Sequence, residues 1–264
     1  MNRPEQVRRQ AARRTVLGRQ ALLLAACLLA GIATGFGLWH ESSNPRFAVE
    51  IVAIRGLAHT AYPDVVTAAE LSPGQNAWLI NRGAVARRIE ALPWVGRAAL
   101  HISWPNRLTI NVIERVPVAR VVLAPQSGAE EPVPRYAAID ETQRVLSVSE
   151  DPKVMGQLPV LVVTPPPSGD VAPGGEFGRR EVGQALDAYR RLSGLGLTIS
   201  EVAIAPSTGI SATADRNLRV LFGEDEDLAA KAQLFHSIVA KISTPSRIAY
   251  VDVRSIHAPT VLYR

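Results

Sequence analysis

The sequence predicts an α+β protein with a single N-terminal transmembrane helix, then a small β-α-α-β-β unit, then a β-rich unit with two helices. Three observations lead to this expectation. Residues 20–40 contain no Asp, Glu, Lys or Arg, and several later runs alternate apolar with polar residues, as half-buried strands do. Two longer segments repeat apolar residues at helical spacing. The expected boundaries are 1–19 for a basic arm, 20–40 for the membrane helix, 47–116 for the first unit and 117–264 for the second.

The positive charge of the chain is concentrated in its first residues. Lys and Arg number 29 and Asp and Glu number 24, a net charge of +5. Residues 1–20 hold six arginines and one acid, which is also a net +5, so the remainder is balanced. A nucleic-acid-binding fold is disfavoured, because its positive charge should lie on the folded part. The single cysteine, Cys27, excludes an intramolecular disulfide framework, a zinc ribbon and an iron–sulfur cluster.

The uncharged stretch at 20–40 has the length of a membrane span. As a helix it would rise about 30 Å, the thickness of a bilayer core. Trp39 lies near its end, where interfacial aromatic residues are common, and the arginines before it should stay in the cytoplasm. A cleaved signal peptide is the alternative, but the apolar run is longer than such peptides usually carry. We therefore expect an uncleaved anchor, with the bulk of the chain outside the cytoplasm.

The first folded unit is expected to contain one strand, two helices and a hairpin. The expected elements are a strand at 47–55, a helix opened by Pro63, a helix at 82–91 with Asn81 as its N-cap, and strands at 97–104 and 108–113. Both helices can then cover one face of a small sheet.

Several residues at the ends of these elements are expected to be structural. Trp94 should seal a helix onto the sheet, and Trp104 should close the inner face of the hairpin. Glu114 and Arg115 are interpreted as a solvated strand end, with a partner contact as the less favoured alternative. His101 falls on the outer face of its strand by the alternation of apolar residues and is expected at the surface.

The second folded unit is expected to consist of short strands and two amphipathic helices. The expected strands are 118–123, 136–140, 145–148, 159–163, 202–205, 210–213, 218–222, 248–254 and 260–263, and the expected helices are 181–192 and 228–242. Segments rich in Pro and Gly at 124–134 and 165–175 indicate loops.

No motif of the sequence indicates catalysis, a cofactor or a metal. The G-x-x-x-x-G-K, H-E-x-x-H and G-x-S-x-G patterns are absent, and the five histidines are scattered. Four acids at 224–227 could suggest a Ca²⁺ site, but no EF-hand spacing follows, and the positive end of a helix dipole explains them better. Asp140 and Asp252 could form a remote carboxylate pair, but a turn explains Asp140 better. We therefore predict no catalytic, cofactor-binding or metal-binding residue.

Short motifs spread over the chain resemble those of one bacterial family. In the first unit they are Ile-Arg-Gly at 54–56 with His-Thr at 59–60, the segment 71–74, Leu-Pro-Trp-Val at 92–95, Trp-Pro-Asn-Arg-Leu at 104–108, and 114–119. The order of the expected elements is that of a POTRA domain, and the residues of these motifs resemble those of the FtsQ/DivIB family of cell-division proteins. In the second unit, the segments 140–141, 158–161 and 250–254 resemble the β domain of that family, less specifically.

The resemblance implies a non-enzymatic divisome scaffold in the bacterial inner membrane, with one membrane pass, a cytoplasmic N-terminus and a periplasmic bulk enriched at the division septum. Such a scaffold links early and late cell-division proteins, helps control septal peptidoglycan synthesis and needs no cofactor. The implied partners are FtsB and FtsL, with FtsK, FtsW and FtsI as further contacts. One alternative, a POTRA-bearing chaperone of membrane or secreted proteins, predicts repeated POTRA units or a membrane barrel. The other, a membrane-anchored cell-wall hydrolase, predicts a nucleophile or metal cluster.

The family places a partner site at the end of the β domain. By resemblance, strand 260–263 would accept a strand of FtsB along its unpaired edge. Arg254 matches a family arginine that could pair with a partner carboxylate, and Tyr263 lies where the family has an aromatic residue. The sequence departs from the family at Ser255, where a tyrosine is typical, and lacks the polar tail that many relatives carry. The expected contacts are Arg254, Ser255, Thr260, Val261, Leu262 and Tyr263. The alternative is an ordinary edge strand without a partner, whose short length and neighbouring Pro259 disfavour unwanted pairing with other strands.

A second partner surface is expected on the first unit. A sheet edge at 47–55 or 108–114 could accept a partner strand, or the helix at 82–91 could contact a partner helix. Arg82, Arg87 and Arg88 lie off the apolar stripe of that helix and are expected to be available. A solvated helix face without a partner is the alternative, because exposed charges usually contribute little.

Overall fold

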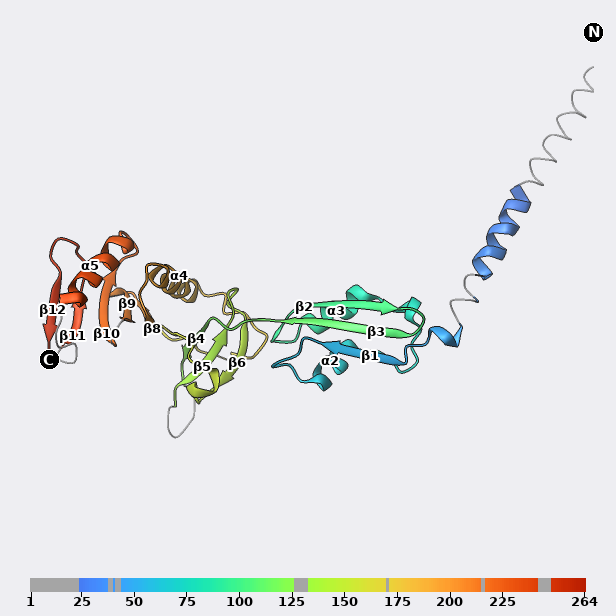
Figure 1. The fold of residues 1–264 in the computed structure, drawn as a ribbon, viewed down its shortest axis with the longest axis horizontal. Coiled ribbons are helices and arrows are strands. Elements are labelled where there is room, and N and C mark those ends of the chain that lie inside the picture. Colours follow the sequence, from blue (N-terminus) through green and yellow to red (C-terminus); the bar gives the residue numbers. More distant parts are fainter. Residues whose placement is uncertain are drawn as a thin grey trace, which may run out of the picture.

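The computed structural model contains two β-sheets, each with its own hydrophobic cluster. It describes residues 24–37, 40, 44–125, 133–169, 171–214, 217–241 and 248–264. One sheet has three strands in the order β1-β3-β2, and the other has nine in the order β12-β11-β10-β9-β8-β7-β4-β5-β6. We call the two parts the three-stranded unit and the nine-stranded unit. They lie end to end along the long axis of the molecule (Figure 1).

The N-terminal segment is described only in part. Residues 24–37 are helical and expose large apolar side chains, among them Leu24, Leu28 and Phe36. In the described part of the chain, no helix combines the length and the apolar character that crossing a membrane requires. The expected arm at 1–19 lies outside the described residues, and the expected span at 20–40 lies partly outside them. The transmembrane helix therefore stays a prediction.

The three-stranded unit has the expected β-α-α-β-β order. Its elements are β1 (Ile51–Arg55), α2 (Tyr62–Ala69), α3 (Arg82–Glu90), β2 (Val95–Ser103) and β3 (Arg107–Glu114), with short 3₁₀ turns η1 (Pro45–Phe47) and η2 (Ala77–Leu79). The strand expected at 47–55 begins later, because Asn44 caps η1 by accepting from the N–H of Arg46. β3 pairs parallel with β1 and antiparallel with β2.

Local sequence signals explain how the helices and strands of this unit are placed. Asn81 accepts a hydrogen bond from the N–H of Ala84, so it is the N-cap of α3, as predicted. Leu108 and Ile110 on β3 are fully buried together with Val65 of α2 and Ile89 of α3. The helices therefore bury their apolar sides against the alternating apolar residues of the hairpin. His101 is exposed, as the alternation predicted.

Two tryptophans of this unit lie differently from their predicted places. Trp94 stacks on the ring of His59 with centroids 4.3 Å apart, so it covers the segment after β1 rather than sealing a helix onto the sheet. Trp104 is 51% exposed and contacts the rings of Trp78 and Phe47, so it does not close the inner face of the hairpin. Both rings pack against segments distant in sequence, which local patterning does not reveal.

The nine-stranded unit contains all the strands and both helices that the sequence predicts. The strands are β4 (Ala119–Leu123), β5 (Arg135–Ile139), β6 (Val145–Ser149), β7 (Val160–Val163), β8 (Ile199–Ala205), β9 (Gly209–Ala214), β10 (Leu218–Gly223), β11 (Ile248–Asp252) and β12 (Thr260–Tyr263). The helices are α4 (Arg180–Gly194) and α5 (Leu228–Lys241), with a 3₁₀ turn η3 (Pro152–Met155). Parallel pairs β4–β7, β7–β8 and β10–β11 interrupt the otherwise antiparallel sheet.

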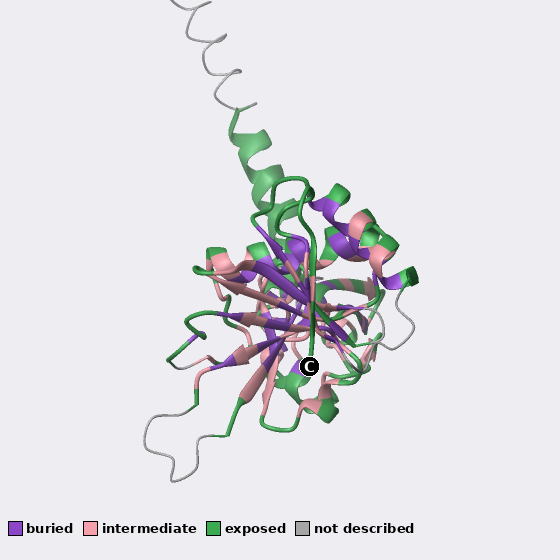
Figure 2. Ribbon diagram, turned by 90° about the vertical axis from the view of Figure 1, so that its left-hand side faces the viewer, coloured by how far each residue is buried: buried purple, intermediate pink, exposed green. Residues whose placement is uncertain are grey.

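The core of the nine-stranded unit lies between its sheet and the two helices. Helix α4 packs on β7 and β8, and α5 packs on β10. The Phe235 ring of α5 meets the Phe222 ring of β10 edge-on, with centroids 6.4 Å apart and both side chains fully buried. Figure 2 shows buried residues along the strands and on one side of the helices. Tyr189 of α4 is partly buried and packs against this core. Residue 242, the expected end of the second helix, lies outside the described residues.

Candidate partner-binding surfaces

The nine-stranded sheet ends at β12, which has one unpaired edge. β12 pairs antiparallel with β11, and no strand of the described chain pairs with its other side. Val261 packs against the core, whereas Leu262 and Tyr263 are 49% and 64% exposed. β12 lies at the end of the molecule farthest from the three-stranded unit (Figure 1). The strand therefore offers free backbone groups and exposed apolar side chains, which is what strand addition by another chain requires.

Arg254 lies just after β11 and is already oriented by Asp252. Its Nε donates to Oδ1 of Asp252 at 3.0 Å and a terminal nitrogen donates to Oδ2 at 2.7 Å. These hydrogen bonds lower the pKa of Asp252 and raise the pKa of Arg254. The stem of Arg254 lies over Gly223, where a Cβ would come within 3.0 Å of the arginine Cγ. About half of the Arg254 side chain is exposed, and Ser255 beside it is also exposed.

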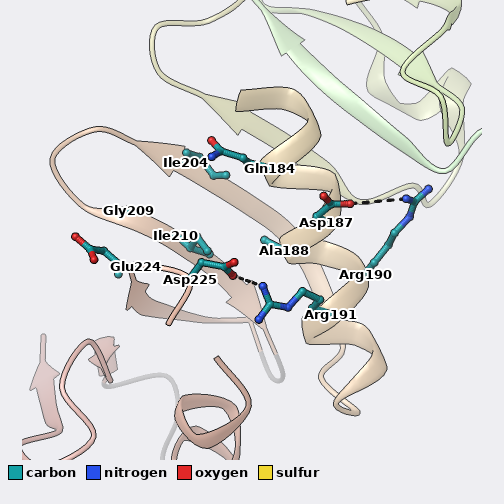
Figure 3. Close-up of a pocket in the computed structure, with 11 residues that line it drawn as sticks. Gln184, Asp187, Ala188, Arg190, Arg191, Ile204, Gly209, Ile210, Glu224 and Asp225 are labelled. Carbon is teal, nitrogen blue, oxygen red and sulfur yellow. Dashed lines mark hydrogen bonds and ion pairs between the residues drawn. The ribbon is translucent and has the colours of Figure 1, made fainter. Parts of the chain in front are cut away.

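The structure brings together a groove that the sequence did not reveal. A hollow of about 540 Å³ lies between α4 and the start of β9 (Figure 3). Its lining includes Gln184, Asp187, Arg190 and Arg191 of α4, Ile210 of β9, and Glu224 and Asp225 after β10. Arg191 bonds Asp225, and Arg190 lies 3.8 Å from Asp187. The charges that line the groove are thus largely paired with one another, and the pairing between α4 and Asp225 joins positions too distant in sequence to be predicted.

The acidic run at 224–227 is explained only in part by the helix dipole. Helix α5 begins at Leu228 and has no acid in its first turn. Asp225 instead bonds Arg191, and the buried Lys231 donates from Nζ to the main-chain oxygen of Glu224 at 2.9 Å. Within the described ranges, no three His, Cys, Asp or Glu side chains come together as a metal site would require. Through these two bonds, Asp225 links the end of β10 to α4, and Glu224 links it to α5.

The three arginines predicted to be available on α3 differ from one another. Arg82 and Arg87 are exposed, as expected. Arg88 is not available, because its Nε donates to the main-chain oxygen of Ala68 at 3.2 Å and lies 3.3 Å from a carboxylate oxygen of Glu70. The last carbonyl groups of a helix lack partners within the helix, and Arg88 supplies one at the end of α2. Arg88 is therefore a structural residue.

The sheet topology corrects one of the two predicted edges of the three-stranded unit. β3 is the central strand, with β1 on one side and β2 on the other, so residues 108–114 cannot accept a partner strand. β1 is an edge strand, and a groove of about 340 Å³ lies beside it. Val52 and Ile54 of β1 and Tyr62 and Val66 of α2 contribute to the lining. The hairpin of β2 and β3 was predictable from its turn, but the parallel pairing of β1 with β3 was not.

Glu114 is buried and hydrogen-bonded, so its interpretation as part of a solvated strand end is wrong. Its carboxylate accepts the main-chain N–H groups of Ala58, His59 and Thr60 at 2.8 to 3.1 Å. Its side chain is 8% exposed. Burial raises the pKa of Glu114, but these N–H donors outweigh it and lower the pKa to about 2. Glu114 thus closes the segment after β1 onto the end of β3.

Arg115 connects the two units and is likewise not a solvated residue. One terminal nitrogen donates to Oδ2 of Asp140 at 2.6 Å. Asp140 also accepts the N–H groups of Thr142 and Arg144, which confirms its predicted role in the turn. Burial raises the pKa of Asp140, but hydrogen bonds from Thr142 and Arg115 outweigh it and lower the pKa. Arg144 donates to the main-chain oxygen of Ala91 at 2.9 Å, so two arginines cross the joint in opposite directions.

Two family models match the chain one after the other. Residues 47–115 match the model described as "POTRA domain, FtsQ-type", and residues 132–254 match the model described as "Cell division protein FtsQ/DivIB, C-terminal". The chain belongs to the FtsQ/DivIB family of cell division proteins. The first match covers the three-stranded unit, and the second covers most of the nine-stranded unit, including Arg254 but not β12.

Individual relatives support the same family over different lengths. The chain is 27% identical to the cell division protein FtsQ of Mycobacteroides abscessus over 95% of this chain and 72% of that protein. It is 28% identical to the protein of the same name from Streptomyces griseus over 81% of this chain and 96% of that protein. It is 30% identical to the FtsQ of Myxococcus fulvus, where the match spans only 35% of that protein.

Proposed function

We propose that the protein is a non-enzymatic scaffold of the divisome at the bacterial inner membrane. In this role it links early and late cell-division proteins and helps to control septal peptidoglycan synthesis. Its membership of a cell-division family supports the process, and the unpaired edge of β12 is the observation that carries the scaffold role. A strand edge flanked by exposed apolar side chains is suited to bind another polypeptide.

The proposed membrane arrangement has residues 1–19 in the cytoplasm, residues 20–40 across the membrane and both units in the periplasm, enriched at the division septum. The charge asymmetry around residues 20–40 supports it. A fluorescent reporter that is inactive in the periplasm should be bright at the N-terminus and dark at the C-terminus. The reverse pattern would overturn the arrangement.

FtsB is the proposed partner of β12, and FtsL would arrive with it. A strand of FtsB would pair with the free edge of β12, while Leu262 and Tyr263 would select its side chains. Asp252 occupies two nitrogens of Arg254, so the remaining guanidinium N–H groups would meet a carboxylate of the partner. Because the guanidinium is held before binding, less side-chain entropy would be lost.

The three-stranded unit would supply a second contact that contributes to localisation, with FtsK, FtsW and FtsI as candidate partners. The edge of β1 with its apolar groove, and the exposed Arg82 and Arg87, are the features that support it. Arg82→Ala together with Arg87→Ala should weaken septal localisation of the full chain. Unaltered localisation would leave these arginines as a solvated helix face.

Copurification of FtsB with the full chain tests the β12 proposal. Leu262→Asp and Tyr263→Asp should each lose FtsB, because they place a charge in the apolar contact. Val154→Asp is the matched control, because Val154 is 75% exposed on η3 of the same unit and should retain FtsB. If the β12 variants fold and bind FtsB as well as the control does, the strand-addition site is wrong.

Arg254 and the strand itself need separate variants. Arg254→Gln is preferable to Arg254→Glu, because a second carboxylate beside Asp252 would repel it and disturb the fold. Arg254→Gln should weaken FtsB binding without abolishing it, since strand pairing remains. A chain truncated after Ala258 lacks β12 and should lose FtsB, and circular dichroism should establish that the truncated chain is folded. Retention of FtsB by the folded truncated chain would contradict the proposal.

A further inference from the structure

An exposed cluster of aromatic side chains lies on the three-stranded unit. The rings of Trp78 and Trp104 have centroids 4.5 Å apart, and Phe47 meets both edge-on at 6.1 and 5.9 Å. Trp78 is 58% exposed, Trp104 is 51% exposed, and Leu79 beside them is 74% exposed. We call Phe47, Trp78, Leu79 and Trp104 the aromatic cap. Large apolar side chains gathered at a surface usually mark a contact with another molecule or with a membrane.

The aromatic cap lies at the end of the unit where the chain enters it. Ile51 at the start of β1 pairs with Arg107 at the start of β3, which in turn pairs with Ser103 at the end of β2. The cap comes from η1, η2 and the turn after β2, all at this end. The opposite end carries Glu114 and the joint to the nine-stranded unit. In Figure 1 the segment before β1 is on the side away from that unit.

The short chain between the expected anchor and the aromatic cap keeps the cap close to a bilayer. The predicted membrane span ends at residue 40, and η1 is capped by Asn44, four residues later. Four residues extend at most about 14 Å, and the headgroup region of one leaflet is about 5–8 Å deep, so the cap cannot lie far from this region. The surface of the bilayer is therefore the partner that this cap meets most readily.

The charges around the aromatic cap match an anionic lipid surface. Arg46 is exposed, with its guanidinium carbon 4.8 Å from the centroid of the Phe47 ring, and Arg107 is exposed at the start of β3. Among the described residues at this end, Glu50 is an exposed acid that accepts a hydrogen bond from the side chain of Asn106 at 2.8 Å, so Arg46 and Arg107 outnumber it by one charge. Exposed aromatic residues flanked by arginines are typical of segments that lie in the membrane interface.

We propose that the aromatic cap inserts into the headgroup region of the bilayer that holds the anchor, with Arg46 and Arg107 against lipid phosphates. Tryptophan is favoured there, because its ring is partly apolar and its N–H can bond to headgroups or water. The insertion would hold β1, β2 and β3 pointing away from the membrane and place the joint and β12 at a distance from it. The proposal rests on the proposed membrane anchor, but an anchor alone would leave the unit free to tumble.

A depth-dependent quenching experiment on the full chain tests the proposal. The chain is reconstituted in vesicles of phosphatidylethanolamine and phosphatidylglycerol, in a Cys27→Ala background, with a polarity-sensitive dye on Leu79→Cys. The dye should shift to the blue and lose most of its emission to a quencher placed in the headgroup region. Ile113→Cys is the matched control, because Ile113 is 64% exposed at the other end of β3 and its dye should keep its emission. Adding Trp78→Ser and Trp104→Ser to the Leu79→Cys chain should remove the quenching.

A dye on the natural Cys27 separates failure of the cap from failure of the anchor. If a deep quencher reaches the Cys27 dye while the Leu79→Cys dye behaves as the Ile113→Cys dye does, the anchor stands and the cap proposal is overturned. If neither the Cys27 dye nor the Leu79→Cys dye is quenched, both are overturned. If both dyes are quenched, the proposal is supported. If the Leu79→Cys dye alone is quenched, the cap binds lipid, but the proposed anchor, and with it the proposal in this form, is overturned.

Discussion

Replacing Glu114 with glutamine should destabilise the three-stranded unit at neutral pH. Both oxygens of the carboxylate accept main-chain N–H groups, from Ala58 and Thr60 at one oxygen and from His59 at the other. Glutamine keeps one carbonyl oxygen but places an NH₂ group at the second position. At least one main-chain N–H then faces a donor instead of an acceptor, and the negative charge is lost.

The size of the effect follows from the pKa of Glu114. A pKa lowered from 4.5 to about 2 means that the fold stabilises the ionised carboxylate over the neutral acid by about 3 kcal/mol. Screening by water reduces this little, because the side chain is 8% exposed. The amide resembles the neutral acid in shape and charge. Glu114→Gln should therefore lower the free energy of unfolding at neutral pH by about 2–3 kcal/mol.

The same pKa fixes the dependence of this difference on pH. The folded pKa lies below the unfolded one, so the stabilisation is fully present above a pH of about 4.5 and is lost as the pH falls towards 2. The free energies of unfolding of the wild type and of Glu114→Gln should therefore converge in that window. Urea unfolding of the full chain, followed by tryptophan fluorescence, measures both, because Trp94 stacks on His59 in the segment that Glu114 holds.

Asp64→Asn is the control for a carboxylate of the same unit. Asp64 is exposed in the first turn of α2, so its loss should cost only a few tenths of a kcal/mol. Equal losses for Glu114→Gln and Asp64→Asn would refute the reasoning. A difference between wild type and Glu114→Gln that stayed constant down to a pH of about 3 would also refute it, because the ionised carboxylate would then not be the stabilising species.

Three further substitutions test other parts of the structure. Asp140→Asn should cost about 2–4 kcal/mol by calorimetry, because it leaves Arg115 without its ionised partner where the Asp140 side chain is 5% exposed, whereas Glu141→Gln in the same turn should change little. Gly56→Ala should lower the free energy of unfolding by more than about 2 kcal/mol, because Gly56 has φ +87° and an added Cβ would lie 2.0 Å from the Val112 carbonyl oxygen. Gly83→Ala in α3 should instead raise the free energy of unfolding by about 0.5–1 kcal/mol, as measured in urea. Phe235→Ala should cost about 3–5 kcal/mol in urea unfolding, because its ring is fully buried against Phe222, and equal cost for the 38% exposed Leu195→Ala would contradict this.

Local patterning determined the elements and the order of this protein. The alternation of Leu108, Ile110 and Val112 identified β3 and its buried face, and Asn81 marked the start of α3. Asp140 could be placed in a turn, since an Asx turn bonds residues only two to four positions away. These signals work because the hydrogen bonds of a helix or turn, and the side-chain directions along a helix or strand, are set by neighbouring residues.

Tertiary structure alone decided which strand edges are unpaired and which charged side chains form hydrogen bonds within the fold. It made β3 the centre of its sheet and β12 an edge, turned Arg88 and Glu114 from expected surface charges into structural bonds, and gathered the aromatic cap from three separate segments. The partners of Glu114 are main-chain N–H groups more than 50 positions earlier, and every residue type carries such a group. A buried carboxylate and an exposed one are therefore alike in sequence, and only the packing of distant segments distinguishes them.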